Sequence, residues 1–227
     1  VSSSFSSLLP DPASFFQNYG VSVQNHSYGT GIENYNGPEA LAYDLQISNS
    51  NDLVHVFSAG NSGNQAASSG RYSGIIGFAN LTGQFKMAKN IITVGATDSF
   101  NIIGPASSRG PAYDGRIKPE LVALGEDGSS GSAALTSGVV AVLQDVYKSL
   151  NSGNLPPVSL LKAILVNSAG DIGTAGPDYQ SGFGALDAGK AVQEIIAGHY
   201  SFSSIQPSQE LTFNLNIPAG CRRTKIT

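Results

Sequence analysis

Three segments in the first half of the chain, at residues 20–29, 53–59 and 90–97, are predicted to form strands. In 53–59 and 90–97 the apolar residues follow one another without regular alternation. Alternating apolar and polar positions would indicate a sheet with one face in water. Continuous apolar character instead favours strands covered on both faces, as in a parallel sheet with crossover helices.

Helical patterns fill the spaces between and after these runs. Asp11 and Pro12 form a helix-start signal, Gly20 a stop signal, and Pro38 begins a second helix. Further helices are predicted from about Ser130 and at 157–169 and 187–197. The order of elements predicts an α/β fold, a three-layer α/β/α arrangement with a mostly parallel sheet.

The pattern changes near the C-terminal end. Residues 211–220, "LTFNLNIPAG", alternate apolar and polar positions, which is typical of a half-buried strand. We therefore expect one domain over residues 1–200 and the beginning of a β-rich domain over 201–227.

Two of the predicted strands end in unusual loops, "NHSYGTG" (25–31) and "SAGNSGN" (58–64). Ligands of parallel sheets bind beyond the carboxyl ends of the strands. Gly29, Gly60 and Gly63 would let an extended ligand approach the main chain, and Asn61 would offer an amide donor. Ordinary strand-to-helix turns explain the same residues, because Gly and Asn are common in turns.

A third candidate is Ser130, which follows Gly128 at the predicted start of a helix. Small residues at Ala134, Gly138 and Ala141 let this helix approach its neighbours closely. The free N–H groups and positive end of the helix dipole would favour an oxyanion beside Ser130. A plain capping role for Ser130 is the alternative.

Composition narrows the classes of function. The 227 residues are 41% hydrophobic and only 12% charged, with a net charge of −4, so no nucleic-acid partner is expected. Cys221 is the single cysteine, and no apolar run reaches the roughly 20 residues that a membrane span needs. We expect no membrane association and no metal-binding motif. The chain begins with Val1, so we expect that an upstream part was removed.

Taken together, the motifs resemble those of the subtilisin-like serine proteases, or subtilases. The family's nucleophile motif is matched by "GSSGSAALTSG" (128–138), although Ser129 replaces a Thr and Ala134 a Pro. The order of the other matches is also that of the family: "NHSYG" (25–29), "HVFSAGNSG" (55–63), "IITVGATDS" (91–99), "SSRGPAYDGRIKPELVALG" (107–125) and "GPDYQSGFGALDAGKAV" (176–192).

The resemblance implies a serine endopeptidase that cleaves polypeptides. Ser130 would be the nucleophile, with Asn61 in the oxyanion hole. Substrate would bind as an added strand along two segments, made of Ser27, Tyr28, Gly29, Ala59 and Gly60. No cofactor is expected, a structural calcium ion is compatible with the family but has no identifiable ligands here, and the location would be secreted or extracytoplasmic.

The family's other two catalytic groups are not matched. Subtilases place an Asp and a His before the Ser in chain order, and their motifs do not occur in this sequence. His26 and His55 lie in predicted buried strands, and His199 lies beyond the last helix. We therefore expect the catalytic Asp and His upstream of Val1, in the same chain or in a separate one, and no meaningful activity from this chain alone.

Two other functions remain open. An inactive, protease-like domain that only binds peptides would explain the altered motif and the unmatched groups. An α/β-hydrolase esterase would use Ser130, Asp178 and His199 in that order, although the Gly-x-Ser-x-Gly elbow fails at Ser132.

Overall fold

A four-stranded parallel sheet forms the centre of the molecule. The computed structural model describes residues 9–217, 219–221 and 224–227. The strands are β1 (Val23–His26), β2 (Val54–Ser58), β3 (Ile92–Thr97) and β4 (Leu121–Leu124), and they pair in that order. The predicted parallel sheet is confirmed. No strand was predicted at β4, which lies in the segment "KPELVAL".

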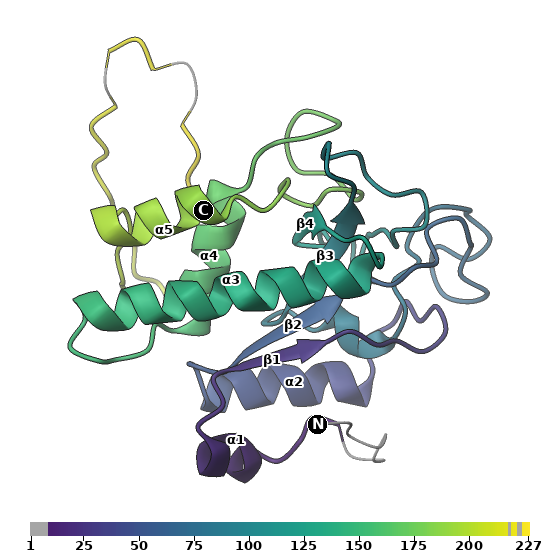
Figure 1. Cartoon of the computed structure of the whole chain (residues 1–227), viewed down its shortest axis with the longest axis horizontal. Helices are drawn as coiled ribbons and strands as arrows, with labels where there is room; N and C mark the ends of the chain where they lie inside the picture. The colour runs from purple at the N-terminus through teal and green to yellow at the C-terminus, as the bar shows by residue number, and fades with distance from the viewer. Residues whose placement is uncertain (1–8, 218, 222–223) are drawn as a thin grey trace.

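The runs at 53–59 and 90–97 form buried strands, as their continuous character predicts, whereas in β1 only His26 is buried. Every residue of β2 and β3 is buried. Figure 1 shows α2 on one side of β1 and β2, and α3 on the other. Helices on both sides remove both faces of these strands from water, which is why no polar alternation is needed.

Five α-helices and one short 3-10 helix accompany the sheet. They are α1 (Ala13–Tyr19), α2 (Pro38–Asn49), η1 (Gln84–Met87), α3 (Ser129–Leu150), α4 (Val158–Ser168) and α5 (Ala188–Ala197). The predicted ends are right to within one or two residues. Gly20 closes α1 in the left-handed conformation, with φ of 60°. Asp187 caps α5 by accepting a hydrogen bond from Lys190 N.

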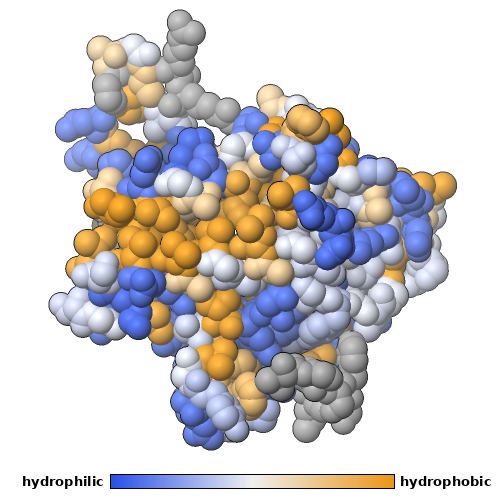
Figure 2. Space-filling model, in the orientation of Figure 1, coloured by the Kyte–Doolittle hydropathy of each residue, from blue (hydrophilic) through white to orange (hydrophobic). Residues whose placement is uncertain are grey.

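Helix α3 lies against all four strands and against α5. Its buried face includes Ala133, Val140 and Leu143. Its opposite face is also apolar, with Leu135, Val142 and Leu150 about half exposed. Figure 2 shows apolar surface on the left of the view, over α3 and α5. Even so, none of the helices in the described ranges is long and apolar enough to cross a membrane.

The C-terminal segment differs from its prediction. Residues 211–217 form no strand, and Leu211, Phe213, Leu215 and Ile217 are exposed. The segment extends away from the helices (Figure 1), and no described residue pairs with it as a neighbouring strand. The alternating pattern is real, but a strand needs a partner for its backbone groups. The proposed domain boundary near residue 200 stays a prediction.

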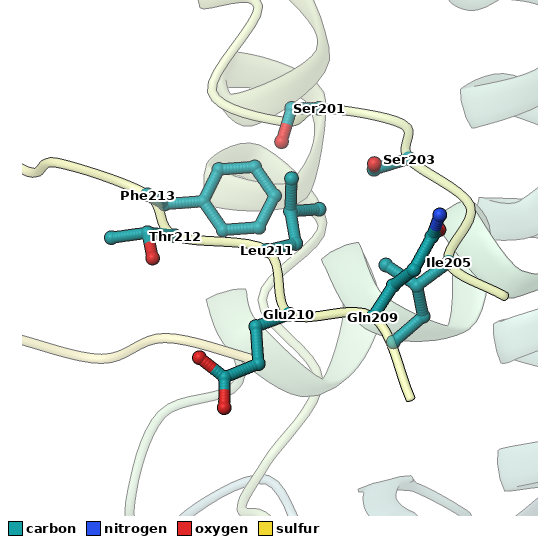
Figure 3. A pocket seen from close by; sticks show the side chains of 8 residues that line it. All are labelled: Ser201, Ser203, Ile205, Gln209, Glu210, Leu211, Thr212 and Phe213. Atoms are coloured by element: carbon teal, nitrogen blue, oxygen red, sulfur yellow. The ribbon is translucent and has the colours of Figure 1, made fainter. Parts of the chain in front are cut away.

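A cavity of about 610 Å³ lies within this extended segment (Figure 3). All its lining residues belong to residues 201–213, and none comes from the sheet or from α3. It is the space between two arms of one loop, and we assign it no function.

Candidate functional site

The candidate site lies where β1 and β2 end and α3 begins. In the parallel register, His26 of β1 lies opposite Phe57 of β2, so the two strands end side by side. The segments that follow them carry Ser27 and Asn61. The first turn of α3 carries Ser130, and hydrogen bonds connect all three segments.

Ser129 holds the Asn61 side chain in one orientation. Asn61 Oδ1 accepts hydrogen bonds from Ser129 N and from Ser129 Oγ, each at 3.0 Å. Ser129 Oγ in turn accepts from Gly60 N at 3.0 Å. Because two donors bind the amide oxygen, the amide nitrogen of Asn61 faces away from Ser129. Among the described residues it has no partner, so it is available to a ligand.

Gly128 makes this close approach possible. A β-carbon at residue 128 would lie 2.7 Å from Asn61 Oδ1, and its φ of +72° is itself unfavourable for other residues. A side chain here would push Asn61 out of place. The close contact with Asn61 therefore explains why a glycine stands before Ser129.

Ser130 is the second residue of α3 and is half-buried. Ser27 Oγ donates to the carbonyl oxygen of Ser130 at 2.9 Å and so ties β1 to α3. Within the described part of the chain, the Ser130 hydroxyl has no hydrogen-bond partner. The Ser130 N–H has none either, as expected in a first helical turn. The nucleophile candidate is therefore placed beside two free donors, its own N–H and Asn61 Nδ2.

The two expected substrate segments face a common side chain, Thr82. A β-carbon on Gly29 or on Gly60 would collide with Thr82 Oγ1. Thr82 N also donates to Ala59 O at 3.2 Å. Behind it, the buried Lys86 donates from Nζ to Thr82 Oγ1 at 2.8 Å. Thr82 thus occupies the space between the two segments.

Lys86 is buried without a carboxylate partner among the described residues. Its Nζ would lie 3.0 Å from a β-carbon on Gly29. Burial lowers the pKa of Lys86 to about 7, because an ammonium group loses its hydration. An amine that loses its charge far more readily than an exposed lysine therefore lies behind the segment that carries Gly29.

Two histidines form a buried polar ladder on the α2 side of the sheet. His26 Nε2 and His55 Nδ1 lie 2.9 Å apart, and His55 Nε2 lies 2.9 Å from Gln46 Oε1. On the other side, His26 Nδ1 lies 2.9 Å from the Tyr28 hydroxyl. That hydroxyl lies 3.3 Å from the Tyr43 hydroxyl, so the side chain of Tyr28 points inward. Only its backbone can contribute to the expected substrate segment.

The ladder keeps its imidazoles neutral. Burial lowers the pKa of His55 to about 3. Burial, followed by the neighbouring His55 and Lys86, also lowers the pKa of His26 well below its usual value. Both ring nitrogens of each histidine already have partners. The expectation that these residues are buried and satisfied is confirmed.

Asp178 and His199 do not join Ser130. His199 Nδ1 lies 2.9 Å from Glu194 Oε2 on the surface. The Asp178 carboxylate accepts hydrogen bonds from the N–H groups of Gln180 and Ser181 in its own loop. The three residues that an esterase would use in the order Ser, Asp, His thus do not form a catalytic triad in the structure.

Comparison with known proteins identifies the family of the chain. The model of the subtilase family matches residues 7–184 of this chain. The chain belongs to the subtilase family.

Individual subtilases are only distantly similar. The subtilisin-like protease SBT6.1 of Arabidopsis thaliana is 29% identical over 140 residues, which cover 52% of this chain and 13% of the relative. The solved structure of the patellamide maturation protease PatA matches with a TM-score of 0.61 at 21% identity, over 81% of this chain and 66% of that one. The prenylagaramide maturation protease PagA matches with a TM-score of 0.60 at 21% identity, over 80% and 64%.

These structural matches establish the subtilisin-like fold of this subtilase. The chain spans about two thirds of the length of the two solved proteases and about an eighth of the curated relative.

Sequence reasoning missed three residues of this subtilase site. Ser129 was noted only as a departure from the family motif, yet its hydroxyl orients Asn61. Thr82 and Lys86 lie 21 and 25 residues after Asn61 in a segment without a recognisable pattern. A lysine inside the run "FKMAKNIITV" was the one available signal, since lysine is rarely buried unless paired.

Proposed function

We propose that this chain forms part of a serine endopeptidase in which Ser130 becomes acylated by the substrate. The observation that carries the proposal is the fixed amide of Asn61 beside the free N–H of Ser130. Ser129 lies between them in the chain, since it holds the Asn61 amide and directly precedes Ser130. Donors fixed before the reaction favour the transition state because no reorganisation is needed when the charge develops.

The proposed reaction begins when Ser130 Oγ attacks the carbonyl carbon of the scissile peptide bond. A general base takes the hydroxyl proton, and the carbonyl oxygen becomes an anion bound by Asn61 Nδ2 and Ser130 N–H. The C–N bond then breaks, and the base returns the proton to the departing amine. Water hydrolyses the resulting ester by the same two steps.

The general base is the missing element of this mechanism. All three histidines of the chain are engaged elsewhere, His26 and His55 in the buried ladder and His199 with Glu194. We therefore propose that the base and its orienting carboxylate come from residues outside this chain. The exposed apolar face of α3, at Leu135, Val142 and Leu150, offers a surface on which such a segment would pack.

Specificity in this proposal follows from Thr82 and Lys86. Thr82 fills the space between the segments of Gly29 and Gly60, so a small or apolar side chain before the cleaved bond is favoured. Lys86 lies behind it and, in its protonated form, would repel Lys or Arg at that position. A secreted location and a structural calcium ion remain expectations.

A peptide-binding role without catalysis is the second candidate. It is favoured by one observation, the lack of any of the chain's three imidazoles beside Ser130. In that case the Gly29 and Gly60 segments would hold an extended peptide, and Ser130 would stay unreactive.

A fluorophosphonate probe distinguishes the two roles when it is applied to the complete protein, which includes the sequence flanking this chain. We expect labelling at Ser130 and loss of labelling in Ser130→Ala. Ser132→Ala is the matched control, because Ser132 Oγ is buried and donates to Ala123 O at 2.9 Å. Peptide binding without labelling would favour the non-catalytic role, and labelling at Ser132 would overturn the assignment.

A turnover assay tests the proposed origin of the base. For residues 1–227 alone we expect no turnover of a chromogenic peptide, and adding the flanking segment should produce turnover.

A further inference from the structure

A second cavity, of about 210 Å³, lies apart from the Ser130 site. It is enclosed by three loops that are distant in the sequence. Its walls include Phe78, Arg109, Thr174, Asp178, Tyr179 and Gln180. None of the residues that orient Ser130 or Asn61 lines it.

Arg109 is the unusual residue of this cavity, because its guanidinium group has no partner among the described residues. Its Nε is buried and makes no hydrogen bond. Arg116 shows the usual arrangement in the same protein: it pairs with Asp114 at 2.7 Å and donates to Met87 O at 2.8 Å. A buried donor without an acceptor is costly, so an orphaned Arg Nε at a cavity indicates a ligand that supplies the acceptor.

The backbone fixes Arg109 firmly in place. Arg109 N donates to the buried Asn80 Oδ1 at 2.7 Å, and Asn80 N donates to Arg109 O at 2.9 Å. The next residue, Gly110, donates from N to Tyr179 O at 2.9 Å, which joins two walls of the cavity. The fixed backbone lowers part of the entropic cost of binding, and the side chain supplies the rest when it is ordered by the ligand.

The other walls restrict the ligand's charge and shape. The Asp178 carboxylate lines the cavity, but its oxygens accept hydrogen bonds from its own loop, and it forms no ion pair with Arg109. One unpaired cation beside one carboxylate suits a single negative charge better than a doubly charged phosphate. The rings of Phe78 and Tyr179 meet edge to face, with centroids 5.6 Å apart, and provide an apolar wall.

We propose that this cavity binds a carboxylate group of a polypeptide, held by the guanidinium of Arg109. A carboxylate is planar and singly charged, and it matches the fork of an arginine. Its source is either an acidic side chain or a free C-terminus. The proposal requires no peptidase activity.

The cavity adjoins the loop that carries Asn61. Ser108, the neighbour of Arg109, donates from N to Gly60 O at 2.9 Å and accepts from Ser62 N at 3.0 Å. These two bonds lie on either side of Asn61 in the sequence. A polypeptide along the Gly60 segment and a carboxylate at Arg109 would therefore contact one connected unit.

The experiment measures the Nε–H resonance of Arg109 in the ¹⁵N-labelled chain. The probes are N-acetylglutamate amide with its side-chain carboxylate, N-acetylalanine with a free terminal carboxylate, and N-acetylglutamine amide as the neutral control. We expect a saturable shift with one or both carboxylates and none with the neutral amide. The carboxylate that shifts the resonance identifies the source.

Variants provide the matched controls. Arg109→Gln should remove the assigned resonance and weaken carboxylate binding, measured by calorimetry, by at least about tenfold. Arg116→Gln should leave binding unchanged, because Arg116 is already paired with Asp114. The wild-type titration needs no variant, so misfolding of Arg109→Gln would not obscure the result. An unshifted Arg109 resonance, or equal shifts with the neutral amide, would overturn the proposal.

Discussion

The start of α3 and the histidine ladder lie close to the same strand ends, yet they use polar residues in opposite ways. At α3, Ser130 and Asn61 keep a hydroxyl and an amide donor unpaired and accessible. In the ladder, His26 and His55 have partners at both ring nitrogens and are almost completely buried. The comparison teaches that residue type alone does not make a catalytic group. A free donor or acceptor at an accessible position is also required.

The different connections of the two regions explain this contrast. Ser129 satisfies the oxygen of Asn61 and leaves its nitrogen free, so one side chain is both fixed and available. In the ladder, Gln46 binds His55 at one end, and the hydroxyl groups of Tyr28 and Tyr43 continue the chain of hydrogen bonds from His26 at the other. Burial then favours the neutral imidazoles, since water cannot solvate their charged form.

The largest expected effect concerns Ser130 in the complete protein, if it acts as the proposed peptidase. Ser130→Ala should lower kcat by about 10⁶-fold, the loss found when the nucleophile of subtilisin is removed. Unfolding by urea should be almost unchanged, because the Ser130 hydroxyl forms no hydrogen bond in the described structure. Steady-state kinetics and urea titration test both statements. Retained activity would place the nucleophile elsewhere.

The next effect concerns Asn61. Asn61→Ala should lower kcat by about 10²- to 10³-fold with little change in KM, because its donor acts on the charge of the transition state; the magnitude is that of subtilisin. Asn64→Ala, on an exposed residue of the same loop, is the matched control. A loss confined to KM would show that Asn61 contributes to substrate binding instead.

Substitutions in the histidine ladder should change the stability of the fold. His55→Leu should lower the free energy of unfolding by about 2 to 3 kcal/mol, because it leaves His26 and Gln46 without their buried partner. His199→Leu should change it by less than about 0.5 kcal/mol, since this side chain is 66% exposed. Urea denaturation measures both. Fluorophosphonate labelling of Ser130 should survive in folded His55→Leu; its loss would make the ladder part of the catalytic machinery.

The pH dependence of stability tests whether the ladder histidines are buried in their neutral form. The pKa of His55 is about 3 in the folded chain and returns to about 6.5 on unfolding, so between these values the unfolded state binds more protons. The free energy of unfolding should therefore fall as the pH drops below about 6.5, by up to about 1.4 kcal/mol per pH unit for each ladder histidine. The slope should be shallower in His55→Leu. Parallel curves would show that the ladder does not titrate on unfolding.

The smallest effect concerns Ser129. Ser129→Ala removes the hydroxyl that bonds Asn61 Oδ1 and should lower kcat by about tenfold, because the amide becomes less well fixed. Ser129→Thr keeps a hydroxyl at the same position and should retain most of the activity. Equal losses in both variants would point to a steric effect in place of the hydrogen bond.

Prediction from sequence succeeded where local patterns carry the information. The buried strands β2 and β3 follow from continuous apolar runs, and the helix ends follow from residues such as Gly20 and Pro38. It failed at 211–217, where the alternating pattern has no partner strand. Strand formation depends on contacts that are distant in the sequence, and the alternating pattern cannot report them.

The candidate site was predicted only in part, for the same reason. Ser27, Asn61 and Ser130 stand in recognisable motifs, and the structure brings their segments together. Thr82 and Lys86 meet Gly29 only through the folded chain. Whether Arg109 has a hydrogen-bond partner depends on how three loops pack around it, and the neighbouring sequence does not indicate this.

The position of α3 has a consequence for biosynthesis. The four strands are made first, and the helix that contacts all of them ends only at Leu150. During translation, one face of the sheet therefore stays without this cover until α3 has left the ribosome. A nascent chain that stalls before this point would expose β2 and β3, whose apolar side chains are prone to aggregate, and would depend on chaperones.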